Sequence, residues 1–448
     1  MYRVATWALV VLAGLYAVAL RLYLAWELPL WLDESWTAIL SSAPTLQSFA
    51  RQMWLDSNAP LYYLLMWVWP FESNLGLKLP SLIFMLGAAA IAAWWRPPGL
   101  SRQAGWFWAF LLLVWQPGIT LFIDARYYAL LILVSTAQTV AYLHLLGQPT
   151  RRCATIWTSI ATLAILTHYF AAIPALVQGL YFLWRHRGRA LRCWPAMLTA
   201  LPAFAWGLYH FPRLRLYAQP GIGWYELILP KAVPDYLFWP IGGTVLIGGG
   251  VLIVAFLFRL RTAPVPNVLP VAGLAAVSAV ILIAAGLIAP MFIGRYLLPT
   301  APPILLAVAA SIRPAGYLPM AIWYFANMGG MFGLANQLDD QASYGLEKPA
   351  RLLPDARVVT WMIDYGGSKI HDPAQMEAML VDAFRRNRQV VEPRWSNDLL
   401  GGDGLIYFYQ SDESAVVDAI KAKWRCIDLH SLGHRGVACA RRYERIGQ

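Results

Sequence analysis

The start of the chain decides the fold. Residues 4–26 read VATWALVVLAGLYAVALRLYLAW, a run long enough to cross a bilayer, and residues 29–36, shortly after it, read PLWLDESW. The first run contains Arg21 and lacks a clear small-x-small cleavage site, so we expect an uncleaved membrane anchor rather than a signal peptide. Two adjacent carboxylates, Asp33 and Glu34, therefore follow a membrane helix closely.

The composition of the whole chain extends this pattern. Of the 448 residues, 59% are hydrophobic and 13% are charged, whereas a soluble domain has about 45–50% and about 25%. This balance nearly excludes a soluble enzyme. Only 8 of the 24 acidic residues but 20 of the 35 basic residues lie before residue 336, which gives that part a net charge of +12 and the last 113 residues a net charge of −1. The part before residue 336 and the last 113 residues therefore differ in their content of charged residues.

Further apolar runs of bilayer length predict additional membrane helices. They lie at residues 77–95, 104–122, 127–146, 190–211, 236–258, 267–289, 296–312 and 315–335. Two regions are ambiguous, residues 60–71 and residues 154–184, and each is compatible with half-helices or a re-entrant segment. We expect roughly 10–12 membrane helices in all, because a spanning helix needs about 20 apolar residues.

Basic residues in the short connections predict the orientation. They are Arg3, Arg96, Arg102, Arg151, Arg152, Arg185, Arg187, Arg189, Arg192, Arg259, Arg261 and Arg313. Cytoplasmic loops carry such an excess of Lys and Arg, and charges spread over many loops do not form a nucleic-acid footprint. The outer connections are then residues 27–59, 123–126, 212–235 and 290–295, which hold seven of the eight acids before residue 336.

From about residue 336 the sequence alternates short β-like runs with amphipathic helices. The runs at 358–364, 405–410 and 437–443 predict strands, and those at 373–388 and 413–424 predict helices. We therefore expect a transmembrane domain over residues 1–335 and a small α/β domain over residues 336–448, outside the cytoplasm. In that compartment a disulfide between Cys426 and Cys439 would survive, and two buried thiols are an equally weighted alternative.

The outer connections carry the candidate chemistry. Asp33 and Glu34 lie among tryptophans directly after the first helix, and a desolvated carboxylate there suits a general base that takes a proton from an attacking hydroxyl or amine. The alternative is that both acids are solvated or occupy the first turn of a helix, where acids are favoured. A second carboxylate, Asp124, is followed closely by Arg126 at the start of the run 127–146.

Arginine–tyrosine pairs recur at the same predicted face. Arg126 precedes Tyr127, and Arg295 precedes Tyr296. A guanidinium group matches a phosphate in geometry and charge, so the two pairs indicate a site for an anionic lipid headgroup. The alternatives are a local ion pair with Asp124 and arginines that extend to bulk phospholipid. A Walker loop, a dinucleotide-binding glycine motif, a zinc-protease His-Glu-x-x-His motif and a Gly-x-Ser-x-Gly motif are all absent from the sequence.

Six motifs together resemble the GT-C glycosyltransferases of the protein-mannosyltransferase and aminoarabinose-transferase type, glycosyltransferase family 39 among them. They are, in chain order, Asp33-Glu34, Asn58-Ala59-Pro60-Leu61-Tyr62-Tyr63, Leu77-Lys78-Leu79-Pro80-Ser81, Asp124-Ala125-Arg126-Tyr127, Thr167-His168-Tyr169 and Arg295-Tyr296-Leu297-Leu298-Pro299. Their order and spacing cover residues 1 to about 312. The resemblance implies a GT-C-like membrane fold with a C-terminal domain outside the cytoplasm.

The resemblance also implies an activity. A GT-C enzyme of this type transfers a hexosyl or pentosyl group, with inversion, from a polyprenyl phosphate such as undecaprenyl phosphate to an acceptor on the outer face of the inner (plasma) membrane. The acceptor would be a glycolipid, a polymer or a protein. By this analogy Asp33 is the general base, and Glu34 and Asp124 position the acceptor or a divalent metal ion, so that all three acids are candidate metal ligands.

The remaining roles follow from the same resemblance. Arg126, Arg295 and Tyr296 would bind the donor phosphate. The candidate substrate-binding residues are Asn58, Tyr62, Tyr127 and His168; a lone His such as His168 more often makes one structural hydrogen bond. The family often has His or Lys followed by Pro-Pro before Leu-Tyr, whereas this chain has Asn58, Ala59 and Pro60 there and so lacks the cationic side chain.

Two other classes of protein compete with this interpretation. A lipid or anion transporter or flippase would use the outer carboxylates and arginines for coupling, but transporters usually show internal repeats and ionisable groups in the middle of helices. We find no repeat, and these acids lie in loops at one face. A catalytically inactive scaffold for the outer domain is the third possibility, and it predicts that replacing Asp33 leaves function intact.

Overall fold

The computed structural model describes residues 2–28, 30, 32–217, 227–260, 265–290, 292–327, 358–362, 404–409, 422, 424–431 and 434–441. Its contacts divide the chain into two compact units. The first unit comprises Met1–Ala25, Asp56–Leu65 and Lys78–Gly330, and the second comprises Trp26–Leu55, Met66–Leu77 and Met331–Gln448. The predicted domain boundary between residues 335 and 336 lies outside the described residues.

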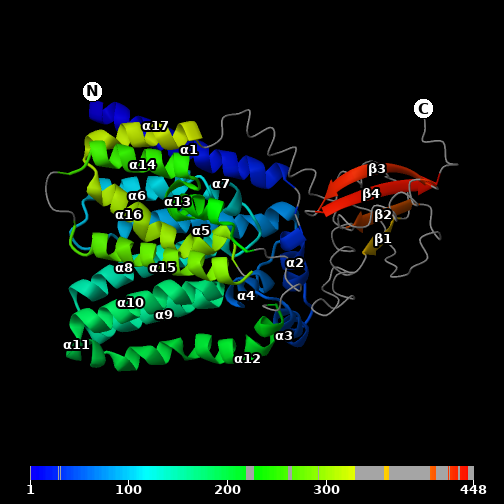
Figure 1. Cartoon of the computed structure of the whole chain (residues 1–448), viewed down its shortest axis with the longest axis horizontal. Helices are drawn as coiled ribbons and strands as arrows, with labels where there is room; N and C mark the ends of the chain where they lie inside the picture. The colour runs from blue at the N-terminus through cyan, green and yellow to red at the C-terminus, as the bar shows by residue number, and fades with distance from the viewer. Residues whose placement is uncertain are drawn as a thin grey trace. The chain divides into compact units, whose positions relative to one another are not determined.

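Long apolar helices form the frame of the first unit (Figure 1). Among the described residues, α1 (Tyr2–Glu27), α5 (Asn74–Trp94), α8 (Tyr128–Gly147) and α15 (Val268–Ile288) each contain a stretch long and apolar enough to cross a membrane. A bent pair, α13 (Val233–Gly242) and α14 (Val245–Leu257), makes up to five spans if it counts as one. The chain is a multi-pass membrane protein.

Shorter helices occupy the other predicted spans and the two ambiguous regions. They are α4 (Leu61–Trp67), α6 (Arg102–Val114), α7 (Gly118–Leu121), α9 (Arg151–Thr167), α10 (Ala172–His186), α11 (Gly188–Leu191), α12 (Leu201–Tyr217), α16 (Ala301–Ser311) and α17 (Tyr317–Asn327). Five 3-10 segments join them: η1 (Tyr169–Ala171), η2 (Trp194–Ala200), η3 (Pro230–Ala232), η4 (Gly294–Thr300) and η5 (Pro314–Gly316). The ambiguous region 154–184 therefore forms two helices, which are separated by an extended residue, His168.

The core of the first unit surrounds α8. Nearly every residue of this helix is buried, and it packs against α9, α16 and η4. A helix that is apolar on all sides belongs in such a central position. Close packing recurs at Gly250 in α14, where an added Cβ would lie 2.1 Å from the Trp323 ring, whereas an added Cβ at Gly249 would have no neighbour within 4 Å.

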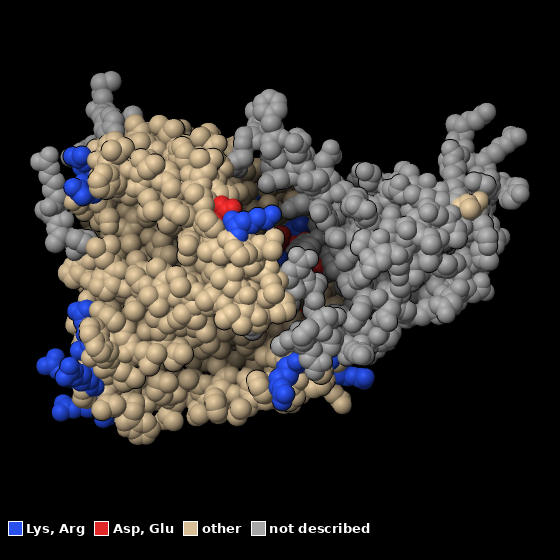
Figure 2. All heavy atoms as spheres, viewed as in Figure 1, with Lys and Arg blue, Asp and Glu red and all other residues tan. Residues whose placement is uncertain are grey.

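Basic side chains gather along one edge of the first unit, the edge where the N-terminus and α11 lie (Figures 1 and 2). Connections that meet there include those of Arg151, whose Nε donates to the carbonyl of Arg192 at 3.1 Å, and of Arg259, which forms an isolated bridge with Ile312. This distribution agrees with the predicted cytoplasmic loops. The orientation in the membrane itself stays a prediction.

In the described residues of the second unit, two short helices and a sheet are present. The helices are α2 (Leu32–Ser41) and α3 (Leu46–Leu55), and the strands are β1 (Val358–Met362), β2 (Gly404–Tyr409), β3 (Trp424–Ser431) and β4 (His434–Arg441). The strand order is β1-β2-β4-β3; β1 and β2 are parallel, and the other two pairs are antiparallel. Trp67 contacts this helical segment: its Nε1 donates a hydrogen bond to the carbonyl of Ala43, between α2 and α3, and its ring stacks on that of Phe49 in α3.

The three predicted strands overlap β1, β2 and β4, but β3 was not predicted. Trp424, which we expected at the end of a helix, instead begins β3. The predicted helix at 373–388 and the rest of the one at 413–424 lie outside the described residues, apart from residue 422. The register pairs Cys426 directly with Cys439. Cross-strand partners have Cα atoms about 4.5–5.5 Å apart, a spacing that a disulfide can bridge.

Candidate functional site

Several predicted site residues of the first unit converge on one place. Arg126 and Tyr127 come from the loop before α8, His168 from the break between α9 and η1, and Arg295 and Tyr296 from η4. These segments are far apart in the sequence. We call them, together with Tyr63 of α4 and Tyr128 of α8, the arginine cluster.

Arg126 is the centre of this cluster. Its side chain is 4% exposed, and its Nη1 donates to the Tyr63 hydroxyl at 2.6 Å. The guanidinium carbon lies 5.8 Å from the centre of the Tyr63 ring and 5.4 Å from that of Tyr127. Cation–π contact with two rings and a charge-assisted hydrogen bond together fix its orientation.

The loop that carries Arg126 is tied to the membrane helices. The hydroxyl of Ser81 in α5 donates to the carbonyl of Asp124 at 2.6 Å. In α7, the short helix that precedes this loop, the carbonyl of Gly118 accepts a hydrogen bond at 3.1 Å from Nε of fully buried Arg21 of α1. A buried guanidinium needs hydrogen-bond acceptors, and backbone carbonyls supply them here. The charged residue within the first apolar run thus holds α7, the helix from which the loop of the candidate site starts.

Ring contacts join the arginine loop to His168 and η4. The Tyr127 ring lies 4.8 Å from the imidazole of His168, which in turn lies 4.8 Å from the Tyr296 ring. The Tyr128 ring lies 4.6 Å from that of Tyr127 and 5.4 Å from the guanidinium carbon of Arg295. The two arginine–tyrosine pairs, which the sequence placed at one predicted face, therefore belong to one continuous cluster.

A hydrophobic core holds η4 in position. Tyr296, Leu297 and Phe292 are buried against Leu282 and Ile283 of α15. Because this core is formed by residues on both sides of Arg295, the guanidinium group is carried on a rigid support. Such a support is required if a charged group is to stay aimed at a ligand.

His168 is neutral in this environment. Burial and the positive charges of Arg295 and Arg126 lower the pKa of His168 from 6.5 to about 3. Its Nδ1 is buried and has no hydrogen-bond partner among the residues that the structure describes. His168 therefore offers a ligand an uncharged imidazole between two cations, and it is not itself a third cation.

Other predicted residues lie beside or outside this cluster. The Tyr62 ring is fully buried and lies 5.8 Å from that of Tyr63. Asn58 accepts at its carbonyl from the Tyr169 hydroxyl and donates from Nδ2 to Asp56, so it belongs to a neighbouring polar cluster. Asp124 is half-buried in the first unit.

Asp33 and Glu34 lie in the first turn of α2, in the second unit. Glu34 is 1% exposed and Asp33 is half-buried. A position at a helix N-terminus is the one that the alternative interpretation predicted.

The described residues include no group of three or more His, Cys, Asp or Glu side chains arranged to hold a metal ion. A divalent ion stays a prediction from the sequence.

Tyr63 and Tyr128 are members of the cluster that were not predicted as site residues. Both follow a predicted site tyrosine, in the pairs Tyr62-Tyr63 and Tyr127-Tyr128. The pairing of two tyrosines was the feature of the sequence from which these two members could have been predicted. Which tyrosine of a pair touches an arginine depends on the helix start, and the sequence does not determine this.

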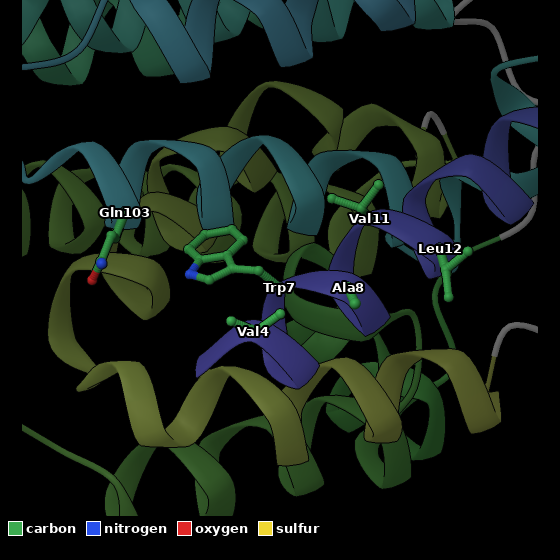
Figure 3. A pocket seen from close by; sticks show the side chains of 6 residues that line it. All are labelled: Val4, Trp7, Ala8, Val11, Leu12 and Gln103. Carbon is green, nitrogen blue, oxygen red and sulfur yellow. The ribbon is translucent and has the colours of Figure 1, made fainter. Parts of the chain in front are cut away.

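A surface groove contains none of the candidate residues. It has a volume of about 720 Å³ and is lined by Val4, Trp7, Ala8, Val11 and Leu12 of α1 and by Gln103 of α6 (Figure 3). Its lining is apolar except for one amide and the indole nitrogen, so it offers no charged group to a phosphate. Such a surface on a membrane helix suits lipid chains.

Comparison with known proteins identifies the fold. No family model and no curated protein sequence matches the chain. Two crystal structures of ArnT from Cupriavidus metallidurans do match over nearly the whole chain. The structure bound to undecaprenyl phosphate has a TM-score of 0.56 at 15% identity and covers 98% of this chain and 99% of its own. The apo structure has a TM-score of 0.58 at 13% identity and covers 97% and 98%.

The chain therefore shares the fold of these ArnT structures, and the GT-C-like membrane fold predicted from the six motifs is confirmed. At this level of identity the likeness concerns the fold.

Proposed function

We propose that this protein is an integral-membrane glycosyltransferase that moves a hexosyl or pentosyl group from a polyprenyl phosphate to an acceptor. The observation that supports this most directly is the arginine cluster. In it the positive charges of Arg126 and Arg295 both help to lower the pKa of His168, which is therefore neutral. A site with two cations and several tyrosine hydroxyls suits a phosphate. The fold is shared with a protein that binds undecaprenyl phosphate, which is a lipid of the proposed donor class.

The proposed reaction is a single displacement with inversion. The acceptor oxygen or nitrogen attacks the anomeric carbon, the bond from that carbon to the phosphate oxygen breaks, and the electron pair leaves with the polyprenyl phosphate. Negative charge then grows on the phosphate, where Arg126, Arg295 and Tyr296 would stabilise it. Fixed positive groups at the place where charge develops lower the barrier most effectively.

The proton of the acceptor needs a base. We assign this role to Asp33, with Glu34 and Asp124 positioning the acceptor. Glu34 is almost completely buried, and it follows Asp33 in the first turn of α2. If a divalent ion takes part, chelation would abolish transfer and added metal would restore it; transfer unaffected by chelation would remove the metal from the scheme.

The proposed function also requires a particular orientation of the protein in the membrane. The basic edge of the first unit would face the cytoplasm of a cell with an inner membrane, and the arginine cluster and the C-terminal sheet would lie outside the cytoplasm. Alkaline phosphatase fused after Gln448 would then be active. A fusion that is active only in the cytoplasm would contradict this orientation.

Transfer of radiolabelled sugar from synthetic polyprenyl-phosphate sugars to membrane extracts tests the function, with Arg126→Gln as the site variant. Arg313→Gln is a matched control, because Arg313 lies in a short basic connection at the predicted cytoplasmic face. We expect transfer by the wild type and the control and a loss of about 100-fold or more in Arg126→Gln, since loss of one charge-stabilising donor costs about 100- to 1,000-fold. Equal rates in both variants would contradict the assignment of the phosphate site.

A further inference from the structure

A second polar cluster adjoins the arginine cluster and is centred on Tyr169. The Tyr169 hydroxyl accepts from Trp206 Nε1 at 2.7 Å, lies 2.7 Å from His210 Nδ1 and lies 3.3 Å from the carbonyl of Asn58. A phenol has one hydrogen to donate. All contacts are satisfied when Tyr169 donates to the Asn58 carbonyl and accepts from both Trp206 and His210. The network therefore binds the loop at Asn58 to α12.

Asp56 lies beside this network, and one of its carboxylate oxygens accepts no hydrogen bond from the described residues. It is 7% exposed, and its Oδ1 accepts from the backbone nitrogen of Ser57 at 2.6 Å and from Asn58 Nδ2 at 2.9 Å. Its Oδ2 is buried and has no hydrogen-bond partner among the described residues. Leaving a buried carboxylate oxygen without a donor is costly, so native structures rarely do it unless a ligand or water completes the site.

The titration of Tyr169 supports the proximity of this carboxylate. Burial raises the pKa of the Tyr169 phenol, the hydrogen bond from Trp206 opposes this shift, and the negative charge of Asp56 adds to it. Asp56 therefore acts electrostatically on the centre of the cluster.

The two clusters are joined by adjacent residues of one segment, His168 and Tyr169. His168 contacts Tyr127 and Tyr296, whereas the next residue, Tyr169, contacts Trp206 and His210. In a polyprenyl-phosphate sugar the phosphate is bonded directly to the ring. If the arginine cluster binds the phosphate, the ring must lie immediately beside it, where the Tyr169 cluster offers hydrogen-bonding groups.

The chemistry of the Tyr169 cluster suits a sugar. A ring sugar presents several O–H or N–H donors and an apolar C–H face, and the cluster combines a carboxylate with aromatic rings. Trp206 is only half-buried, and Tyr209, whose ring lies 5.6 Å from it, is 58% exposed. Aromatic side chains with one apolar face and one polar edge are well adapted to such ligands.

We propose that Asp56 recognises the sugar of the lipid-phosphate donor, accepting on Oδ2 a hydrogen bond from a ring hydroxyl or amine. This inference rests on the proposed function, because it takes the arginine cluster as the phosphate site. It makes Asp56 a specificity-determining residue that acts on the sugar and not on the phosphate.

The test compares two ligands on the purified full-length protein. One is bare polyprenyl phosphate, and the other is a panel of the same lipid carrying mannose, glucose or aminoarabinose. Binding is measured for the wild type, Asp56→Asn and the control Asp235→Asn, an acid of α13 whose Oδ1 caps the backbone nitrogen of Val245. Asparagine keeps the Oδ1 acceptor of Asp56 and changes the Oδ2 side, and retained binding of the bare lipid shows that the variant is folded.

We expect the wild type to prefer at least one sugar-bearing lipid to bare polyprenyl phosphate. In Asp56→Asn the affinity for that lipid should fall about 10- to 100-fold, as for loss of a hydrogen bond to a charged group, with unchanged affinity for the bare lipid. A stronger effect on the aminoarabinose lipid than on the neutral sugars would identify an amine as the group that Asp56 binds.

Other results would overturn the proposal. An unchanged sugar preference in Asp56→Asn, or an equal loss for both lipids, would remove Asp56 from sugar recognition while leaving the phosphate site intact. Absence of binding of either lipid to the wild type would instead refute the proposed function itself. If Asp56→Asn does not fold, Asp56→Glu keeps the charge and displaces it, and the same loss of preference is expected; a retained preference would contradict the inference.

Discussion

The hydroxyl group of Tyr63 provides a sharp test of the arginine cluster. Tyr63→Phe removes only the oxygen that accepts from Arg126 Nη1 at 2.6 Å. Both side chains are almost completely buried, at 0% and 4% exposure, so water does not readily replace the lost acceptor. The ring remains, and with it the contact between the aromatic face and the guanidinium group.

The size of the effect follows from the bond. A hydrogen bond to a charged group contributes about 1.5–3 kcal/mol, and a buried donor left unsatisfied costs a similar amount. If the loss falls on the step in which charge develops on the phosphate, about 1.4 kcal/mol corresponds to a tenfold change in rate. We therefore expect transfer to fall about 10- to 100-fold in Tyr63→Phe, with a lower unfolding temperature.

The matched control is Tyr142→Phe. Tyr142 is also 0% exposed, and its hydroxyl donates to the carbonyl of Gln178 at 2.6 Å between α8 and α10. The two variants should lose comparable thermal stability, but only Tyr63→Phe should lose transfer from a polyprenyl-phosphate sugar. An equal loss of transfer in both variants would show that the effect is one of stability, and unchanged transfer in Tyr63→Phe would refute the role of this hydrogen bond.

Three further predictions concern other parts of the chain. Because the pKa of His168 is lowered to about 3, His168→Gln should leave the acidic limb of the rate–pH profile between pH 5 and 8 in place, and a shifted limb would contradict a neutral His168. Gly250→Ala should lower the unfolding temperature, since overpacking costs about 1–3 kcal/mol, whereas Gly249→Ala should not. After export, Cys426 and Cys439 should resist alkylation until the protein is reduced; labelling without reductant would refute the disulfide.

The long helices could be predicted from the sequence because their apolar runs are uninterrupted. The runs at 127–146 and 267–289 correspond to α8 (Tyr128–Gly147) and α15 (Val268–Ile288) within two residues. The end of α9 at Thr167 could not be predicted in this way. The apolar run continues through that point, and the break depends on the extended conformation of His168, whose ring packs on tyrosines from other segments.

Strand β3 shows a different limit. Its sequence, WRCIDLHS, does not alternate regularly between apolar and polar residues, so the period of two is weak. Its pairing with β4 is a tertiary feature. The hairpin partner, rather than the local pattern, defines the strand.

Most members of the arginine cluster were predictable from the sequence, but Tyr63, Tyr128 and the contacts between the members were not. Arginine–tyrosine pairs at loop ends pointed to Arg126 and Arg295 because charged residues are rare in an apolar chain. The sequence did not show that Tyr63 would bind Arg126, or that Asp56 would lie beside Tyr169. Those contacts join residues that are distant in sequence, and they depend on how the helices pack.

The central claim is sugar transfer from a lipid phosphate with Asp33 as the base. Its most direct test is the transfer of radiolabelled sugar from the preferred polyprenyl-phosphate donor to membrane extracts by the wild type and by Asp33→Asn. We predict transfer by the wild type and a fall of about 100-fold or more in the variant, the scale expected for loss of a general base. Transfer that is unchanged in Asp33→Asn, or absent with every donor in the wild type, would contradict the account.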